Sequence, residues 1–105
     1  MTTPASSRNT FNSDSGAVTL VLDGRAVRHQ LTIETAAGAG ALAFAFRPNG
    51  GTTYQAVTDG SVDLSSGVRL VIFEGDADSV QITPDGSVPA ATSYTIVYSA
   101  RRGHG

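Results

Sequence analysis

The chain lacks several residues and patterns that mark common protein classes. It contains no cysteine, no tryptophan and no lysine among its 105 residues. Without cysteine there is no disulfide framework and no thiolate zinc site, so the sequence does not indicate an oxidising or a reducing compartment. It also has no run of 18 apolar residues, which excludes a membrane-spanning helix and predicts no membrane partner.

Charge is scarce as well. All seven basic residues are arginines, the net charge is −2, and only Arg101 and Arg102 are adjacent. A nucleic-acid binder needs a basic stripe, so we predict no nucleic-acid partner. Residues 1–16, rich in Ser, Thr and Asn, lack the apolar core of a secretory signal. If the protein leaves a cell, we expect another route, for instance inside an assembled particle.

What is present is an alternation of apolar and polar residues with a period of two, and this pattern predicts β-strands. Two alternating runs flank the turn signal Asp23-Gly24 and predict a hairpin over residues 17–35. The inward face of its second strand is predicted to carry Val27, His29, Leu31 and Ile33.

Residues 41–54 combine a strand with a turn at 48–51. One face of the strand carries Leu42, Phe44 and Phe46, and the other carries Ala41, Ala43 and Ala45. The large side chains are expected to be core anchors. The alanines are small enough for a second surface to approach their face closely.

The rest of the chain continues in short strands, predicted at residues 54–58, 61–64, 68–73, 79–83 and 93–99. The strand at 68–73 is apolar on both faces toward its end, so we expect it in the centre of a sheet. Seven or eight short strands with turns about every eight to twelve residues predict an all-β fold. We expect a single small antiparallel β-sandwich, either a jelly roll or immunoglobulin-like.

The domain organisation follows from these patterns. We predict a flexible polar N-terminal arm at residues 1–16, a β-sandwich domain at 17–100 and a short basic tail at 101–105. The arm is either disordered or orders against a neighbouring subunit, with Phe11 as its anchor.

Candidate catalytic and ligand-binding residues are few. His29 is expected to be a core or interface histidine, because general-base catalysis needs a positioned partner that the sequence does not supply. His104 lies in the terminal tail. The acidic run at 74–78 offers oxygen ligands for calcium, but it lacks the spacing and closing Glu of an EF-hand and is expected to be an acidic turn. We predict no enzyme activity, no catalytic residues, no cofactor and no metal.

Residues 44–98 resemble a known group of proteins. The segment at 49–57, Asn-Gly-Gly-Thr-Thr-Tyr-Gln-Ala-Val, is similar to the "DG-x-x-Y/W-x-x-V" hairpin of small β-sandwich modules from tailed-bacteriophage virions, with Asn-Gly-Gly in place of Asp-Gly. In those modules, strands like 68–73 and 79–83 follow, and a strand similar to 93–99 closes the sequence.

Such modules occur as capsid decoration or cement proteins, head fibres and tail or baseplate appendages. The resemblance therefore implies a non-enzymatic structural protein of the virion, assembled in the host cytoplasm. We expect a decoration or cement protein, a homo-oligomer (trimer or dimer) that bridges subunits of the major capsid protein or another virion protein. The alternative is a tail, baseplate or fibre module that binds host carbohydrate or a receptor through the loops at 48–53 and 84–92, with Tyr54 as the aromatic nearest to such a site.

Overall fold

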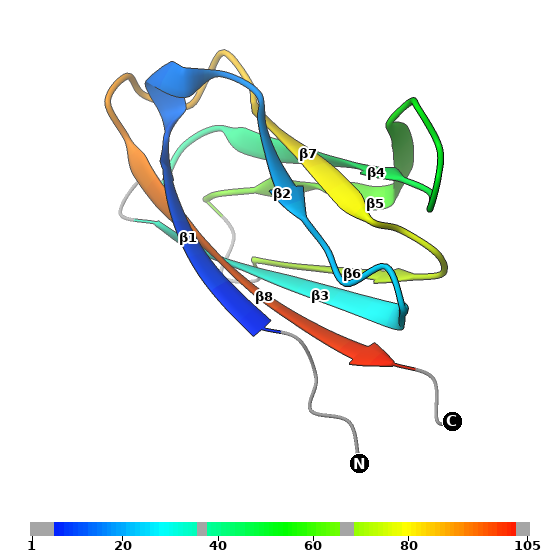
Figure 1. Cartoon of the computed structure of the whole chain (residues 1–105). Helices are drawn as coiled ribbons and strands as arrows, with labels where there is room; N and C mark the ends of the chain where they lie inside the picture. Colours follow the sequence, from blue (N-terminus) through cyan, green and yellow to red (C-terminus); the bar gives the residue numbers. More distant parts are fainter. Residues whose placement is uncertain (1–5, 36–37, 66–68, 103–105) are drawn as a thin grey trace.

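The computed structural model describes residues 6–35, 38–65 and 69–102 (Figure 1). This part of the chain contains eight strands and a short 3-10 helix: β1 (Ser6–Asn12), η1 (Ser13–Ser15), β2 (Val18–Val21), β3 (Ala26–Thr35), β4 (Ala41–Arg47), β5 (Gln55–Asp63), β6 (Leu70–Glu74), β7 (Ser79–Pro84) and β8 (Ser93–Arg102). No helix among the described residues is long and apolar enough to cross a membrane. The prediction of a small all-β sandwich is confirmed.

The strands form two antiparallel four-stranded sheets that face each other (Figure 1). Sheet A has the order β1-β8-β3-β6, and sheet B has the order β2-β7-β4-β5. Eight strands divided between two sheets in this interleaved order make a jelly roll. Of the two topologies expected from the sequence, the chain adopts this one.

The predicted hairpin over residues 17–35 is wrong. β2 pairs with β7 in sheet B, whereas β3 pairs with β6 and β8 in sheet A. The link at Asp23 crosses from one sheet to the other. Its carboxylate accepts a hydrogen bond from the Arg25 backbone N–H at 3.0 Å and pairs with Arg102 Nε at 2.8 Å. These contacts hold the crossing against the end of β8. In a hairpin, β3 would instead have paired with β2.

The inward face of β3 is correct at three of its four predicted positions. His29, Leu31 and Ile33 are buried, but Val27 is 48% exposed. The pairing of β3 with β8 is irregular between Ala26 and Arg28. This bulge inserts one residue, so Ala26 points into the core and Val27 points out.

The break predicted between the strands at 54–58 and 61–64 is instead a bulge within β5, which is one continuous strand. Its pairing with β4 shifts between Ala43 and Ala45. Gly60 lies at this point, and a side chain there would come 2.8 Å from the carbonyl oxygen of Phe44. Only a glycine lets the two backbones approach this closely.

The core lies between the two sheets and contains the residues that the alternation placed there. Leu42, Phe44 and Phe46 of β4 are at most 2% exposed, as are Tyr94, Ile96 and Tyr98 of β8. Phe46 stacks on Phe73 of β6, with 4.4 Å between ring centroids and 11° between planes. This stack joins sheet B to the last strand of sheet A.

The N-terminal segment differs from the predicted flexible arm. Residues 6–12 form β1 and pair with β8 along their whole length, from Ser6 opposite Ser99 to Asn12 opposite Ser93. Phe11 packs against Tyr94 of its own chain, with 5.7 Å between ring centroids. The tail is also shorter than predicted, because Arg101 and Arg102 belong to β8. Residues 1–5 of the predicted arm and 103–105 of the predicted tail lie outside the described residues.

Replacing Phe11 by alanine tests whether β1 is part of the folded domain. Because the ring is half-buried against Tyr94, we expect the free energy of unfolding to fall by about 2 kcal/mol in urea denaturation. Thr10→Ala is the matched control, since Thr10 is exposed and its hydroxyl bonds to that of Thr95 across the outer face. A loose arm would give equal midpoints for Phe11→Ala and wild type.

Candidate functional site

His29 is fully buried and fixed by its neighbours. Its Nδ1 lies 2.7 Å from the hydroxyl of Tyr98. The same hydroxyl accepts a hydrogen bond from the backbone N–H of Asp23 at 3.0 Å. Burial lowers the pKa of the imidazole. His29 has no exposed surface. Its ring stacks on Tyr98 and lies beside Phe73, both within sheet A, so in this geometry it is a buried part of the core.

In the acidic run at 74–78, Asp78 makes structural contacts. Asp78 accepts a hydrogen bond from Arg47 Nε at 3.1 Å and a longer one, 3.4 Å, from the backbone N–H of Gly50. Ala77 is buried within the core. No group of three or more His, Asp or Glu side chains in the described ranges is placed to hold a metal ion.

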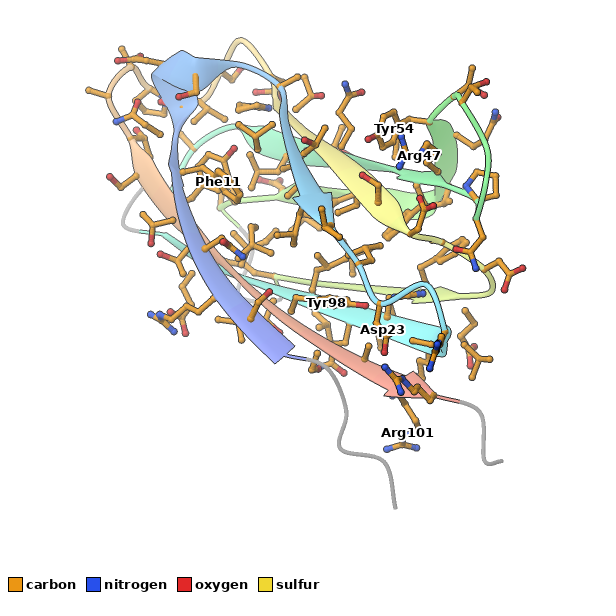
Figure 2. All side chains as sticks on the ribbon, in the orientation of Figure 1. Phe11, Asp23, Arg47, Tyr54, Tyr98 and Arg101 are labelled. Atoms are coloured by element: carbon orange, nitrogen blue, oxygen red, sulfur yellow. The ribbon has the colours of Figure 1, made fainter. Side chains whose placement is uncertain are left out.

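Tyr54, the aromatic considered for sugar stacking, is already engaged. The guanidinium of Arg47 lies over its ring, 5.6 Å from the centroid, and its hydroxyl is 2.8 Å from the hydroxyl of Ser79 (Figure 2). One face of the ring is therefore covered. Arg47 also pairs with Asp78, so the cluster ties the turn at 48–51 to the start of β7.

The two arginines at the end of β8 have different surroundings. Arg102 pairs with Asp23, whose carboxylate is 8% exposed, and the guanidinium lowers the pKa of that carboxyl group. Arg101 points the other way, into solvent (Figure 2). It lies opposite Arg28 of β3, on the outer face of sheet A.

Two sheet edges carry exposed apolar side chains. β6 ends sheet A, where Leu70 is 39% exposed and Ile72 43% exposed. The expectation that this strand is central is wrong: one apolar face packs into the core through Val71, and the other faces outward beside a free edge. β2 ends sheet B, and its last residue, Val21, is 81% exposed.

The other two edges are protected. β1 carries polar side chains on its outer face, including Arg8, which pairs with Glu34 of β3. β5 is bulged at Gly60, and a bulge disturbs the regular backbone spacing that another strand needs. We refer to β2 and β6 as the open edges. They border opposite sides of the sandwich, because β1 and β2 lie on one side and β5 and β6 are neighbours on the other (Figure 1).

No signal within a single strand distinguishes these edges, because position in a sheet depends on pairing between distant segments. The apolar character of both faces of residues 70–73 was visible in the sequence, and it indicates burial on both sides. In the isolated chain only one of those sides is buried.

Comparison with known proteins gives a fold relationship. No protein family model and no curated protein matches the chain. Four chains of solved structures match. One is a protein of Bacillus endospore appendages, described as a family of disulfide-linked pili; its TM-score is 0.54 at 15% identity, over 94% of this chain and 88% of that chain. At this identity the likeness shows a shared fold alone.

Proposed function

We propose that the protein is a non-catalytic structural subunit that joins copies of itself by pairing β2 of one copy with β6 of the next. The open edges carry this proposal. Unpaired backbone N–H and C=O groups at a sheet edge form hydrogen bonds with another strand, and natural proteins usually block such edges with charge, proline or bulges. This chain blocks β1 and β5 but leaves β2 and β6 apolar.

The two open edges suit each other. β2 has four residues and β6 has five, so their ladders match in length. Pairing brings Val21 of one copy next to Leu70 and Ile72 of another, and removes apolar surface from water on both. The edges are different strands on opposite sides, so the contact is heterologous, and repetition gives a ring or an open filament. Each contact also adds burial that a 105-residue chain cannot achieve alone.

The endospore appendage protein supports an assembly of this kind, because a similar fold serves there in pili. Those pili are described as disulfide-linked, whereas this chain has no cysteine. Its residues would therefore join copies through hydrogen bonds and apolar contacts alone. The bacteriophage virion, the capsid partner and the glycan-binding alternative stay predictions from the sequence.

Substituting Ile72 by lysine tests the edge contact. A lysine at a sheet edge places a charge where the next strand would lie, so we expect the variant to sediment as a monomer under conditions in which the wild type forms larger assemblies. Val21→Lys is expected to act equally from the other side of the contact. Sedimentation velocity and electron microscopy at about 1 M salt, where the screening length is about 3 Å, limit the measurement to contacts that do not depend on charge.

The matched control is Thr10→Lys, which adds the same charge to the outer face of the protected edge β1. It should assemble like the wild type, and circular dichroism should show the same fold for all three variants. A wild type that stays monomeric at high concentration, or lysine variants that assemble normally, would rule out edge pairing.

A further inference from the structure

Two arginines on the outer face of sheet A are held next to each other, and neither forms an ion pair with another described residue. Arg28 of β3 and Arg101 of β8 are direct cross-strand partners. Like charges in this position destabilise a sheet. The ion pairs of the described residues involve Arg8, Arg47 and Arg102, but neither of these two. Glu74 lies opposite Arg28 on β6, yet no ion pair joins them.

The space between these arginines is open. Together with Gln30, Ser99 and Ala100 they line a hollow of about 160 Å³. Gln30 and Ser99 are the next cross-strand pair on the same face, so two guanidinium groups, an amide and a hydroxyl surround the hollow. Guanidinium groups are the preferred partners of carboxylates and other oxyanions, which they bind through paired N–H groups. We refer to Arg28, Gln30, Ser99 and Arg101 as the arginine hollow.

An acidic groove lies on sheet B, with a volume of about 350 Å³. Asp63 of β5 and Asp85, which follows β7, stand on its two walls, and Ala41 of β4 lies between them. The small side chain of Ala41 leaves the groove open. The carboxylate of Asp63 accepts hydrogen bonds from the backbone N–H and the hydroxyl of Ser65, at 2.9 and 2.7 Å. These bonds lower the pKa of Asp63.

The hollow and the groove cannot meet within one molecule. The arginine hollow is on sheet A near the start of β3, and the acidic groove is on sheet B. Gly40, which lines the groove, follows the far end of the ten-residue strand β3. A strand of this length spans about 30 Å. Two features that lie on different sheets at opposite ends can come together only between copies.

We propose that the arginine hollow binds Asp63 and Asp85 of a second copy of this chain. This inference rests on the proposed self-assembly and adds a second contact, between sheet faces instead of sheet edges. Two guanidinium groups meet two carboxylates, and the long arginine side chains enter a groove whose floor is alanine. The contact is heterologous, like edge pairing, and the two can therefore coexist in one assembly.

Charge reversal tests the face contact, and it is carried out in the Ile72→Lys chain so that edge pairing is blocked. One variant carries Arg28→Glu and Arg101→Glu, and the other carries Asp63→Arg and Asp85→Arg. At about 0.01 M salt, where charges act over about 30 Å, we expect the Ile72→Lys chain to associate in sedimentation velocity. Each charge-reversed variant alone should associate at least about tenfold more weakly.

Mixing the two charge-reversed variants is the decisive step. Each face of one variant then meets an opposite charge on the other, so association should return to the level of the Ile72→Lys parent. Failure to recover on mixing, or unchanged association of either variant alone, would overturn the proposal. An Ile72→Lys parent that is monomeric at low salt would also overturn it and would leave edge pairing standing. If Val21→Lys and Ile72→Lys fail to disrupt assembly but mixing restores association, the edge-pairing proposal is wrong and the face contact stands.

Two further measurements test whether the arginine hollow contacts a second copy or a free anion. Because the chain has no cysteine, single-cysteine variants Ser99→Cys and Ser61→Cys report proximity directly: on oxidation of an equimolar mixture, the mixed dimer should exceed the half share that random pairing gives. A statistical distribution of the three dimers counts against the face contact. Titration with inorganic phosphate covers the other source of an oxyanion. Phosphate binding that is lost with Arg28→Glu, without recovery of association on mixing, would assign the hollow to a free anion and reject the second copy.

Discussion

Replacing Gly40 by alanine is expected to lower the free energy of unfolding by about 2–4 kcal/mol, the sum of a backbone cost and a steric cost. Gly40 has a φ of +85°, which side-chain-bearing residues rarely adopt. A Cβ there would also lie 2.5 Å from the backbone nitrogen of Val88 and 2.6 Å from its Cγ2. The backbone of Gly40 cannot easily move away, because its carbonyl oxygen accepts the hydrogen bond of Leu64 N–H at 2.8 Å.

Alanine substitutions at two other glycines separate the backbone cost from the steric cost. Gly50 has a φ of +75° but no atom within 4 Å of a Cβ, so Gly50→Ala should show the backbone cost alone, about 1–2 kcal/mol. Gly38 has neither a positive φ nor a close neighbour, and Gly38→Ala should leave the urea midpoint unchanged or slightly higher. Equal midpoints for all three variants would show that the loop after β3 does not pack against residues 87–88 as described.

The second large effect is a loss of stability as pH falls below about 6.5, caused by His29. Burial lowers the pKa of the folded imidazole from its ordinary value of 6.5, while the Gly75 backbone, Asp23 and Asp76 partly oppose this effect. Below 6.5 the unfolded chain binds a proton at this position and the folded chain does not. Protonation therefore favours unfolding, and stability falls by up to about 1.4 kcal/mol per pH unit until the folded pKa is reached.

His29→Gln provides the comparison. This variant should be less stable than the wild type near pH 8, because the Tyr98 hydroxyl loses its imidazole partner. As pH falls below 6.5, its stability should decline less steeply than that of the wild type. Asp23 does not obscure the result: its pKa is lowered from 3.8 by Arg102, so its contribution is lost only below that value. Parallel pH profiles for both proteins would contradict the assignment to His29.

The sequence predicted the two faces of most strands and the main core, because side-chain alternation is a local property of a strand. It placed Leu42, Phe44 and Phe46 correctly, and the inward face of β8 as well. It did not separate a jelly roll from an immunoglobulin-like sandwich, because pairing joins segments far apart in the chain. The hairpin error has the same origin, since Asp23-Gly24 turns the chain equally well within one sheet or between two.

β1 was missed for a different reason. Phe11 is its only large apolar residue, so its sequence carries almost no alternation. The segment becomes a strand because β8 offers a matching ladder and Tyr94 offers a surface for the Phe11 ring.

The candidate interfaces could not be predicted from local sequence patterns either. Arg28 and Arg101 are unremarkable in the sequence and become a pair only when β3 and β8 lie side by side.

The open edges belong to different sheets, and this has a mechanical consequence. In a row of copies joined β2 to β6, a pulling force enters each molecule through sheet B and leaves through sheet A. No backbone ladder among the described residues joins the two sheets, so the load passes between them through the covalent crossing at Asp23 and through core contacts such as the Phe46–Phe73 stack. The tensile strength of such a row would therefore be limited by side-chain packing inside each subunit as much as by the joints between subunits.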